Sequence, residues 1–313
     1  MSLWSENGLS GIFASEDPLP GPLAGLYVCL ASGPPQGIRA VGGPAADLME
    51  INSRPGRRSV SSRAPRVGRY SLCCVNDYDQ RLVELYDQDN PDGPDHAFYR
   101  ALANEVSAHS ILDLGCGTGI LTVTFTGEGR DVVGIDPSPA MLAYAGRRPG
   151  AGDVEWILGD SSSIPRSGFD YAVMTGNVAQ HIPDGQWERT LLDLRQSLTK
   201  GGTLAFESRN PLVRAWDGWA SARTTRDTLH GPLTEWQDMS ATAPGIIELT
   251  FHNRFADTGD TVTGSLVLAF RSRRLLEEQL HSAGFEIEAT YGDWDRTPFT
   301  DGSPLIILVA RAQ

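Results

Sequence analysis

The feature that most constrains the fold of this chain is a short apolar run that leads into a glycine-rich loop. Ser110–Leu114 predicts a buried strand, and the loop Gly115-Cys116-Gly117-Thr118-Gly119 follows it directly. Glycine lets the backbone approach a ligand closely, and a helix that begins at such a loop points its N-terminus at the ligand. We therefore expect an α/β fold whose first strand ends at a nucleotide-type ligand site.

Strands and helices alternate around this loop. Phe98, Leu102 and Val106 recur at helical spacing, which predicts a helix over residues 96–108. We also expect a helix directly after the loop and another that begins at Ser138-Pro139. Trp187, Leu191, Leu194 and Leu198 predict a further helix, which ends at Gly201-Gly202. A last helix is expected from Ser272 to Gly284. The expected strands are 110–114, 131–135, 154–158, 171–174, 203–206, 285–291 and 305–310. This order predicts an α/β, doubly wound, Rossmann-like fold with a mostly parallel seven-stranded sheet that helices cover on both faces.

The alternation breaks at Asn210-Pro211. Three consecutive antiparallel strands are predicted over residues 232–241, 246–256 and 261–270, with a turn at 257–260. The middle strand has an apolar face and a polar face, and the polar face carries His252. Because the α/β pattern resumes afterwards, residues 211–270 are predicted to be an antiparallel β insertion after strand five of a domain that spans 75–313.

Residues 1–74 differ in composition from the rest of the chain. They are dense in Pro, Gly, Ser and Arg and have no helical or strand periodicity. Such a segment buries too little apolar surface to offset its ordering entropy, which predicts disorder. Two alternatives stay open: a mis-called N-terminal extension, with Val75 as an alternative initiator, and a basic regulatory arm around residues 54–69.

The charge distribution argues against a nucleic-acid partner. The chain carries 26 basic and 39 acidic residues. Residues 1–74 hold 7 Arg and 5 acidic residues, which leaves 19 basic and 34 acidic residues from 75 onward. A nucleic-acid binder needs a positive surface. No apolar run is long enough to span a bilayer, and the four cysteines have neither zinc-ligand nor disulfide-framework spacing, so we expect a cytoplasmic protein without a membrane partner or a metal.

The glycine spacing separates two kinds of cofactor. A dinucleotide fingerprint needs a third glycine where Ile120 stands, which argues against a nicotinamide dehydrogenase. The string from Ile111 to Gly119, ILDLGCGTG, resembles instead the first motif of class I S-adenosylmethionine-dependent methyltransferases. The resemblance continues in order over about residues 78–313: VGIDPSPAML at 133–142, GDS at 159–161, FDYAVM at 169–174 into Asn177, and LTKGGT at 198–203.

This resemblance implies S-adenosyl-L-methionine as the cofactor, with S-adenosyl-L-homocysteine as the product. It implies that Asp136 accepts hydrogen bonds from the ribose hydroxyls and that Asp160 receives the adenine amino group. Tyr78 and Tyr86 resemble tyrosines of a helical N-terminal segment that closes over the cofactor, although core packing explains either one equally well. The predicted cofactor-binding residues are Tyr78, Tyr86, Asp113, Gly115, Cys116, Gly117, Gly119, Asp136, Pro137, Met141, Asp160, Ser161 and Asn177.

Catalytic candidates must lie at the carboxyl ends of the strands, where open α/β sheets bind ligands. Methyl transfer is an in-line displacement that needs a general base only when the nucleophile starts protonated. His181, after strand four, is the first candidate for a base, or it orients the turn before a helix that Asp184 caps. Glu207, after strand five, is a catalyst, a substrate clamp or a structural carboxylate.

The acceptor itself is not identified by any motif. Candidate substrate residues are Arg209, Trp216, His252 and Trp294, with core packing as the alternative for the tryptophans and a surface role for the histidine. The insertion resembles the lid of amino-sugar and glycine-type N-methyltransferases, which implies a small-molecule N or O nucleophile and a homodimer. The alternatives are a catalytically silent S-adenosylmethionine-binding regulator, or an RNA or protein methyltransferase, which the acidic domain disfavours.

The composition of residues 1–74 generates a truncation prediction. A chain that starts at Cys74 should keep its melting temperature and its affinity for S-adenosylmethionine, because the removed segment is predicted to bury little apolar surface. Thermal unfolding and calorimetry measure both quantities. A clear loss of either would mean that the removed segment packs on the domain.

Overall fold

The computed structural model describes residues 77–127 and 129–313, so the predictions made for residues 1–74 and Val75 lie outside it. The described residues form a seven-stranded sheet in the order β10-β11-β5-β4-β1-β2-β3. Its strands are β1 Ser110–Leu114, β2 Asp131–Asp136, β3 Val154–Leu158, β4 Phe169–Met174, β5 Leu198–Arg209, β10 Phe285–Tyr291 and β11 Leu305–Ala312. β11 runs antiparallel to β5 and β10, and the other pairs are parallel. This confirms the predicted fold class.

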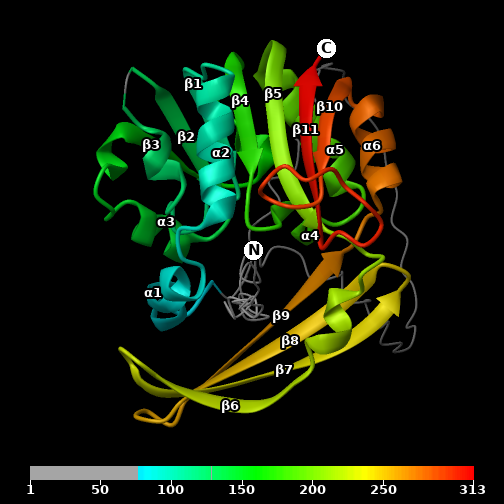
Figure 1. The fold of residues 1–313 in the computed structure, drawn as a ribbon. Coiled ribbons are helices and arrows are strands. Elements are labelled where there is room, and N and C mark those ends of the chain that lie inside the picture. The colour runs from blue at the N-terminus through cyan, green and yellow to red at the C-terminus, as the bar shows by residue number, and fades with distance from the viewer. Residues whose placement is uncertain (1–76, 128) are drawn as a thin grey trace, which may run out of the picture. The chain divides into compact units, whose positions relative to one another are not determined.

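Helices cover both faces of this sheet. They are α1 Gln80–Asp89, α2 Pro94–Glu105, α3 Pro139–Ala145, α4 Val178–His181, α5 Gln186–Ser197 and α6 Arg273–Ser282. One apolar core joins α5 and α6 to the side chains of Leu112 and Leu114, whereas a second core joins α2 to Ile111. Since successive side chains of a strand point to opposite faces, these are the two sides of the sheet (Figure 1). No helix in the described part of the chain is long and apolar enough to cross a membrane.

Local sequence signals explain where several helices begin. Ser138 accepts a hydrogen bond from the backbone N–H of Met141, and Ser272 accepts one from Leu275, as the predicted N-caps should. The helix expected directly after the glycine loop is wrong, because Thr122–Phe125 forms only a 3-10 turn. All four of those residues have β-branched or aromatic side chains with low helix propensity, and Gly127 follows closely.

Two boundaries around α5 also differ from the prediction. The helix ends at Ser197 rather than at the glycine pair, because Leu198 already pairs with Phe169 as the first residue of β5. Its N-cap is Gly185 rather than Asp184. The Asp184 carboxylate instead accepts a hydrogen bond from Arg271, a partner that lies 87 residues away and gives no local signal.

The insertion at 211–270, all of it described, forms a four-stranded antiparallel sheet in the order β6-β7-β8-β9. The strands are β6 Ser221–Thr228, β7 Gly231–Ala243, β8 Ile246–Phe255 and β9 Thr261–Ala269. The prediction missed β6, an edge strand whose sequence SARTTRDT has no apolar alternation. Along β8, Leu249 and Phe251 are buried while Glu248 and Arg254 are exposed, so the predicted two faces are confirmed. We call this four-stranded sheet the lid sheet.

The buried face of the lid sheet packs against α1 and α3. One apolar cluster joins Val83 and Tyr86 of α1 and Met141 of α3 to Leu249 and Phe251 of β8. Leu82 and Leu85 of α1 form a second cluster with Leu233 and Phe255. In Figure 1 the lid sheet lies beyond the end of the seven-stranded sheet toward which β4 and β5 run. The lid sheet therefore stands over the carboxyl ends of the parallel strands.

Arg271 fixes the segment after β4 to the end of the lid sheet. It follows β9 and its side chain is 3% exposed. Its guanidinium donates to the backbone carbonyls of Ala179 and Ile182, each at 2.8 Å, and to the Asp184 carboxylate at 2.7 Å. These bonds hold both ends of the short helix α4.

Replacing Arg271 should therefore destabilise the fold. In Arg271→Met two buried carbonyls lose their donor, and we expect the free energy of unfolding to fall by roughly 2–4 kcal/mol. Urea denaturation measures this change. The matched control is Arg274→Met, whose side chain is 86% exposed and pairs with Glu278 on the same helix, and which should change stability by less than about 0.5 kcal/mol. Equal losses in the two variants would contradict the clamping role of Arg271.

Candidate active site

The glycine loop is shaped by three residues with positive φ. Gly115, Gly117 and Gly119 have φ values of 82°, 54° and 72°. A Cβ atom at Gly115 would lie 2.5 Å from Cγ2 of Val178, and one at Gly119 would lie 2.6 Å from the Trp156 ring. These two glycines are required by packing. A Cβ at Gly117 would meet no atom within 4 Å. Of the three glycines, Gly117 is therefore the one that borders open space.

Asp136 lies beside this space at the carboxyl end of β2. Its carboxylate accepts hydrogen bonds from the backbone N–H groups of Gly117 and Ser138, each at 2.9 Å. Burial raises the pKa of Asp136 to about 6, against the effect of these two bonds. The carboxyl group thus ties the middle of the glycine loop to the end of the neighbouring strand, and its remaining lone pairs suit the two hydroxyls of a ribose.

Asp113 lies on β1, two residues before the loop. Its Oδ2 accepts from the hydroxyl of Thr122 at 2.6 Å, while its Oδ1 is buried and has no hydrogen-bond partner among the described residues. Burial raises the pKa of Asp113 to about 7. A buried oxygen without a donor is costly unless a ligand supplies one. The open space at Gly117 and the unused oxygen of Asp113 therefore fit a cofactor with ribose and ammonium groups.

The third predicted acidic position has a different environment. Asp160 is exposed, and its Oδ1 accepts from the backbone N–H and the hydroxyl of Ser162. Ser161 is buried and donates to Asp193 at 2.7 Å. The structure therefore leaves Asp160 at the rim, and the resemblance alone supports its contact with adenine.

The remaining predicted cofactor residues surround the loop. Cys116 and Met141 are buried, and Pro137 is half-buried beside Asp136. Tyr78 and Tyr86 are buried in the same apolar cluster as Met141 and the lid sheet. Both tyrosines thus pack in an apolar cluster, which is the alternative given for them.

A polar contact that the sequence analysis missed docks α1 onto the glycine loop. The hydroxyl of Thr118 donates to the Asp87 carboxylate at 2.7 Å. Arg148, after α3, donates to the same carboxylate and to the carbonyl of Thr118. Thr118 lies 31 positions after Asp87 and 30 before Arg148, so no local pattern could have indicated that the three residues meet.

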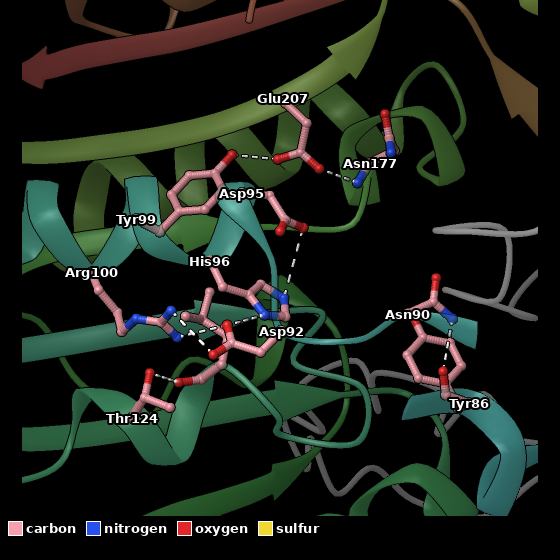
Figure 2. A network of polar contacts seen from close by, with 11 residues as sticks. Tyr86, Asn90, Asp92, Asp95, His96, Tyr99, Arg100, Thr124, Asn177 and Glu207 are labelled. Carbon is pink, nitrogen blue, oxygen red and sulfur yellow. Dashed lines mark hydrogen bonds and ion pairs between the residues drawn. The ribbon is translucent and has the colours of Figure 1, made fainter. Parts of the chain in front are cut away.

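A buried hydrogen-bonded group centres on Glu207 (Figure 2). One oxygen of its carboxyl group accepts from the Tyr99 hydroxyl of α2, and the other accepts from the backbone N–H of Asn177. Asn177 follows β4 with φ of 62°, a conformation that Asn tolerates better than most residues. Burial raises the pKa of Glu207 to about 7, and burial together with the nearby Glu207 carboxylate raises that of Tyr99 well above its usual value.

Sequence reasoning did not single out Tyr99. It neighbours Phe98 in the helical pattern, and nothing local distinguishes its hydroxyl from that of a core tyrosine. Only the docking of α2 on the sheet brings this hydroxyl to the end of β5.

The other catalytic and substrate candidates lie at different places. His181 is buried at the end of α4, between the two carbonyls that Arg271 holds. The Arg209 guanidinium lies 5.2 Å from the Trp219 ring, and burial lowers its pKa to about 10. Trp216 and Trp219 pack on Phe270, with ring centroids 4.5 and 5.9 Å from it.

Two substrate candidates, His252 and Trp294, do not hydrogen-bond to the group around Glu207. His252 lies on the outward face of the lid sheet, where it stacks on Trp236 at 4.8 Å and its Nε2 lies 3.0 Å from the Asp238 carboxylate. Trp294 packs on Phe98 and Tyr99, each at 5.8 Å. The structure thus does not bring His252 to the group around Glu207, which agrees with the surface role given as its alternative, and its contact with the acceptor stays a prediction. Trp294 supports the Tyr99 ring from the core side.

Within residues 77–127 and 129–313, no group of three or more His, Cys, Asp or Glu side chains could hold a metal ion.

Comparisons with known proteins agree with this arrangement. The family model described as a methyltransferase domain matches residues 111–202. Glycine N-methyltransferase of Rattus norvegicus is 28% identical over 131 residues, which are 36% of this chain and 45% of that enzyme. The chain thus spans less than half the length of the first curated relatives it matches. Glycine/sarcosine N-methyltransferase of Parasynechococcus marenigrum is 27% identical over 233 residues, 71% of this chain and 79% of that enzyme.

A solved structure extends the likeness over the lid sheet. The sugar N-methyltransferase KedS8 from Streptoalloteichus matches with a TM-score of 0.59 and 19% identity, and the match covers 82% of this chain and all of that one. At this identity the match concerns the fold. The glycine loop and the buried carboxylates of Asp113 and Asp136 lie within residues 111–202, the part of the chain that matches the methyltransferase-domain model.

Proposed function

We propose that this chain transfers the methyl group of S-adenosylmethionine to an N or O nucleophile of a small molecule by in-line displacement. The observation that carries the proposal is the buried Asp136 carboxylate, bonded to the Gly117 N–H beside open space at the ends of the parallel strands. Relatives named glycine N-methyltransferase and glycine/sarcosine N-methyltransferase act on small amines, and a structural neighbour is named a sugar N-methyltransferase. These names support a small acceptor.

The chain's own residues would hold the cofactor from three sides. When bound, S-adenosylmethionine supplies an electrophilic methyl group on a positively charged sulfur. Asp136 accepts hydrogen bonds from the ribose hydroxyls, and Asp113 Oδ1 accepts from an ammonium group or an intervening water. The backbone at Gly117 allows close approach because no side chain occupies that space. Asp160 and the buried Ser161 contribute the rim at the adenine end.

On the acceptor side the residues would orient the nucleophile and manage its proton. His181 accepts that proton where the nucleophile starts protonated. Glu207 acts as a positioning residue, since its carboxyl group fixes the Asn177 turn from which α4 begins. The lid sheet excludes water, which strengthens the electrostatic interactions inside the site. Holding the nucleophile close to the methyl group and aligned with it is the largest contribution expected from the protein.

The cofactor half of this proposal is tested by Asp136→Ala. The change removes two charge-assisted hydrogen bonds to the ribose, each worth roughly 1.5–3 kcal/mol. Calorimetry with S-adenosylhomocysteine should show an affinity loss of at least about tenfold. The control is Asp153→Ala, an exposed position before β3. An unchanged affinity in a folded Asp136→Ala or Asp136→Asn variant would refute the cofactor assignment.

The catalytic half is tested by following S-adenosylhomocysteine formation across a panel of small amines, amino acids, alcohols and phenols. Turnover with at least one small acceptor is expected, and it should disappear with Asp136→Ala at subsaturating cofactor. Cofactor binding without turnover on any acceptor would favour the catalytically silent regulator instead.

The environment of Glu207 generates a prediction about pH. Its pKa is raised from 4.5 to about 7 in the fold, so the unfolded chain loses this proton at lower pH than the folded one. Between these two values the folded protein binds more protons, and the free energy of unfolding falls as the pH rises. Glu207→Gln removes this dependence. Between about pH 5 and about pH 8, wild type should lose up to about 3 kcal/mol relative to the variant.

Urea denaturation at both pH values measures this difference. The exposed Glu155→Gln on β3 is the matched control and should run parallel to wild type. A Glu207→Gln variant that also runs parallel to wild type would show that this carboxyl group ionises in the fold as easily as in the unfolded chain.

A further inference from the structure

Three polar side chains interrupt the apolar inner face of the lid sheet. Glu235 and Gln237 lie on β7, and Asn253 lies on β8 directly opposite Glu235. All three are buried, with Gln237 4% and Asn253 1% exposed. Apolar residues lie on both sides of them: Leu233 and Phe255 at one end of the strands, and Leu249 at the other. An inner face that served only for packing would continue the apolar pattern through these positions.

Two of these side chains carry amide atoms that the described residues leave unused. The carboxylate of Glu235 has a hydrogen-bond partner, because Arg226 donates to it at 2.7 Å. Gln237 donates to the backbone carbonyl of Trp219 through its Nε2. Its Oε1 and the Nδ2 of Asn253, however, are buried and have no hydrogen-bond partner among residues 77–127 and 129–313. Buried polar atoms without partners are rare in folded proteins and call for a specific explanation.

One of the two amides, that of Gln237, is connected to the end of β5 and to α4. Gln237 holds the Trp219 carbonyl, and the Trp219 ring lies under the Arg209 guanidinium. The backbone N–H of Arg209 in turn donates to the Oε1 of Gln180 on α4 at 3.4 Å. The Nε2 of Gln180 is also buried without a partner in the described chain. A continuous series of contacts thus leads from Gln237 to α4 and the end of β5, and Asn253 is linked to Gln237 by its place on the adjacent strand β8.

We propose that Gln237 and Asn253 recognise the methyl acceptor by hydrogen-bonding its hydroxyl groups, so that the substrate is a polyhydroxylated small molecule. This inference rests on the proposed function. A hydroxyl group donates and accepts, and it therefore pairs with an amide in either orientation of the O and N atoms. The two amides lie on adjacent strands, one residue pair apart, which suits neighbouring hydroxyls of one ring. The ring of Trp219 and the side chain of Phe251 supply apolar surface beside them.

The first test uses the free protein and needs no acceptor. In Asn253→Leu an unused buried amide becomes an apolar side chain of similar size, so the melting temperature should rise by about 2–4 °C or stay unchanged. The control is Glu248→Gln on the outward face of the same strand, with no change expected. A clear fall in the melting temperature of Asn253→Leu would mean that this amide stabilises the fold, and it would overturn the proposal.

The second test follows S-adenosylhomocysteine formation with four amines. Glucosamine and 2-aminocyclohexanol carry ring hydroxyls, cyclohexylamine is a ring of similar size to 2-aminocyclohexanol without hydroxyls, and glycine is a small amine without a ring. The hydroxylated amines should be preferred over cyclohexylamine by at least about tenfold in kcat/KM. Asn253→Leu and Gln237→Leu should abolish that preference, while S-adenosylhomocysteine affinity stays within about twofold. Equal use of all four amines, or preference for glycine or cyclohexylamine, would overturn the proposal. Failure of wild type to bind S-adenosylhomocysteine would instead count against the proposed function.

Discussion

The hydrogen bond between the Gly117 N–H and the Asp136 carboxylate is the interaction on which the site depends. It joins a loop after β1 to the end of β2, and it positions one acidic group beside the only glycine of the loop whose missing side chain leaves open space. Parallel strands bring their carboxyl ends to one edge of the sheet. The other groups of the site lie at the same edge. Asp113 lies on β1 two residues before the loop, Asn177 follows β4, Glu207 lies near the end of β5, and the lid sheet lies beyond the strand ends (Figure 1).

Much of this arrangement follows from local sequence. The strand ending in glycines, the cap at Ser138 and the alternating faces of β8 depend on contacts between near neighbours in the chain, and the structure confirms them. The prediction of a helix after the loop was wrong. It rested on the loop alone, and the residues that follow, Thr122–Phe125, have low helix propensity. Strand β6 was missed because an exposed edge strand needs no apolar face. Local patterns therefore predicted the sheet better than its edges and turns.

The contacts that shape the acceptor side could not be predicted in this way. Tyr99 meets Glu207 across 108 positions, and Arg271 meets Ala179 across 92. Both pairs form only when elements distant in sequence dock, and a tyrosine or arginine in a helical or loop segment gives no sign of its partner. The sequence likewise gives no sign of the unused amide atoms of Gln237 and Asn253, because only the folded structure shows that these atoms are buried without hydrogen-bond partners among the described residues. The glycine loop and the strand-end carboxylates follow recognisable motifs, whereas these contacts depend on the assembled fold.

Helix α1 has a consequence that concerns both ligands. Asp87 binds Thr118 in the glycine loop, while Asp89 binds Arg226 of the lid sheet at 2.8 Å. One short helix thus contacts both the glycine loop and the lid sheet. Any movement of α1 alters both contacts together. Linkage is reciprocal, so if cofactor binding shifts α1 and thereby changes the affinity for a ligand at the lid sheet, that ligand changes the affinity for the cofactor by the same factor. The ten residues of α1 would then couple the two ligands whichever of them binds first.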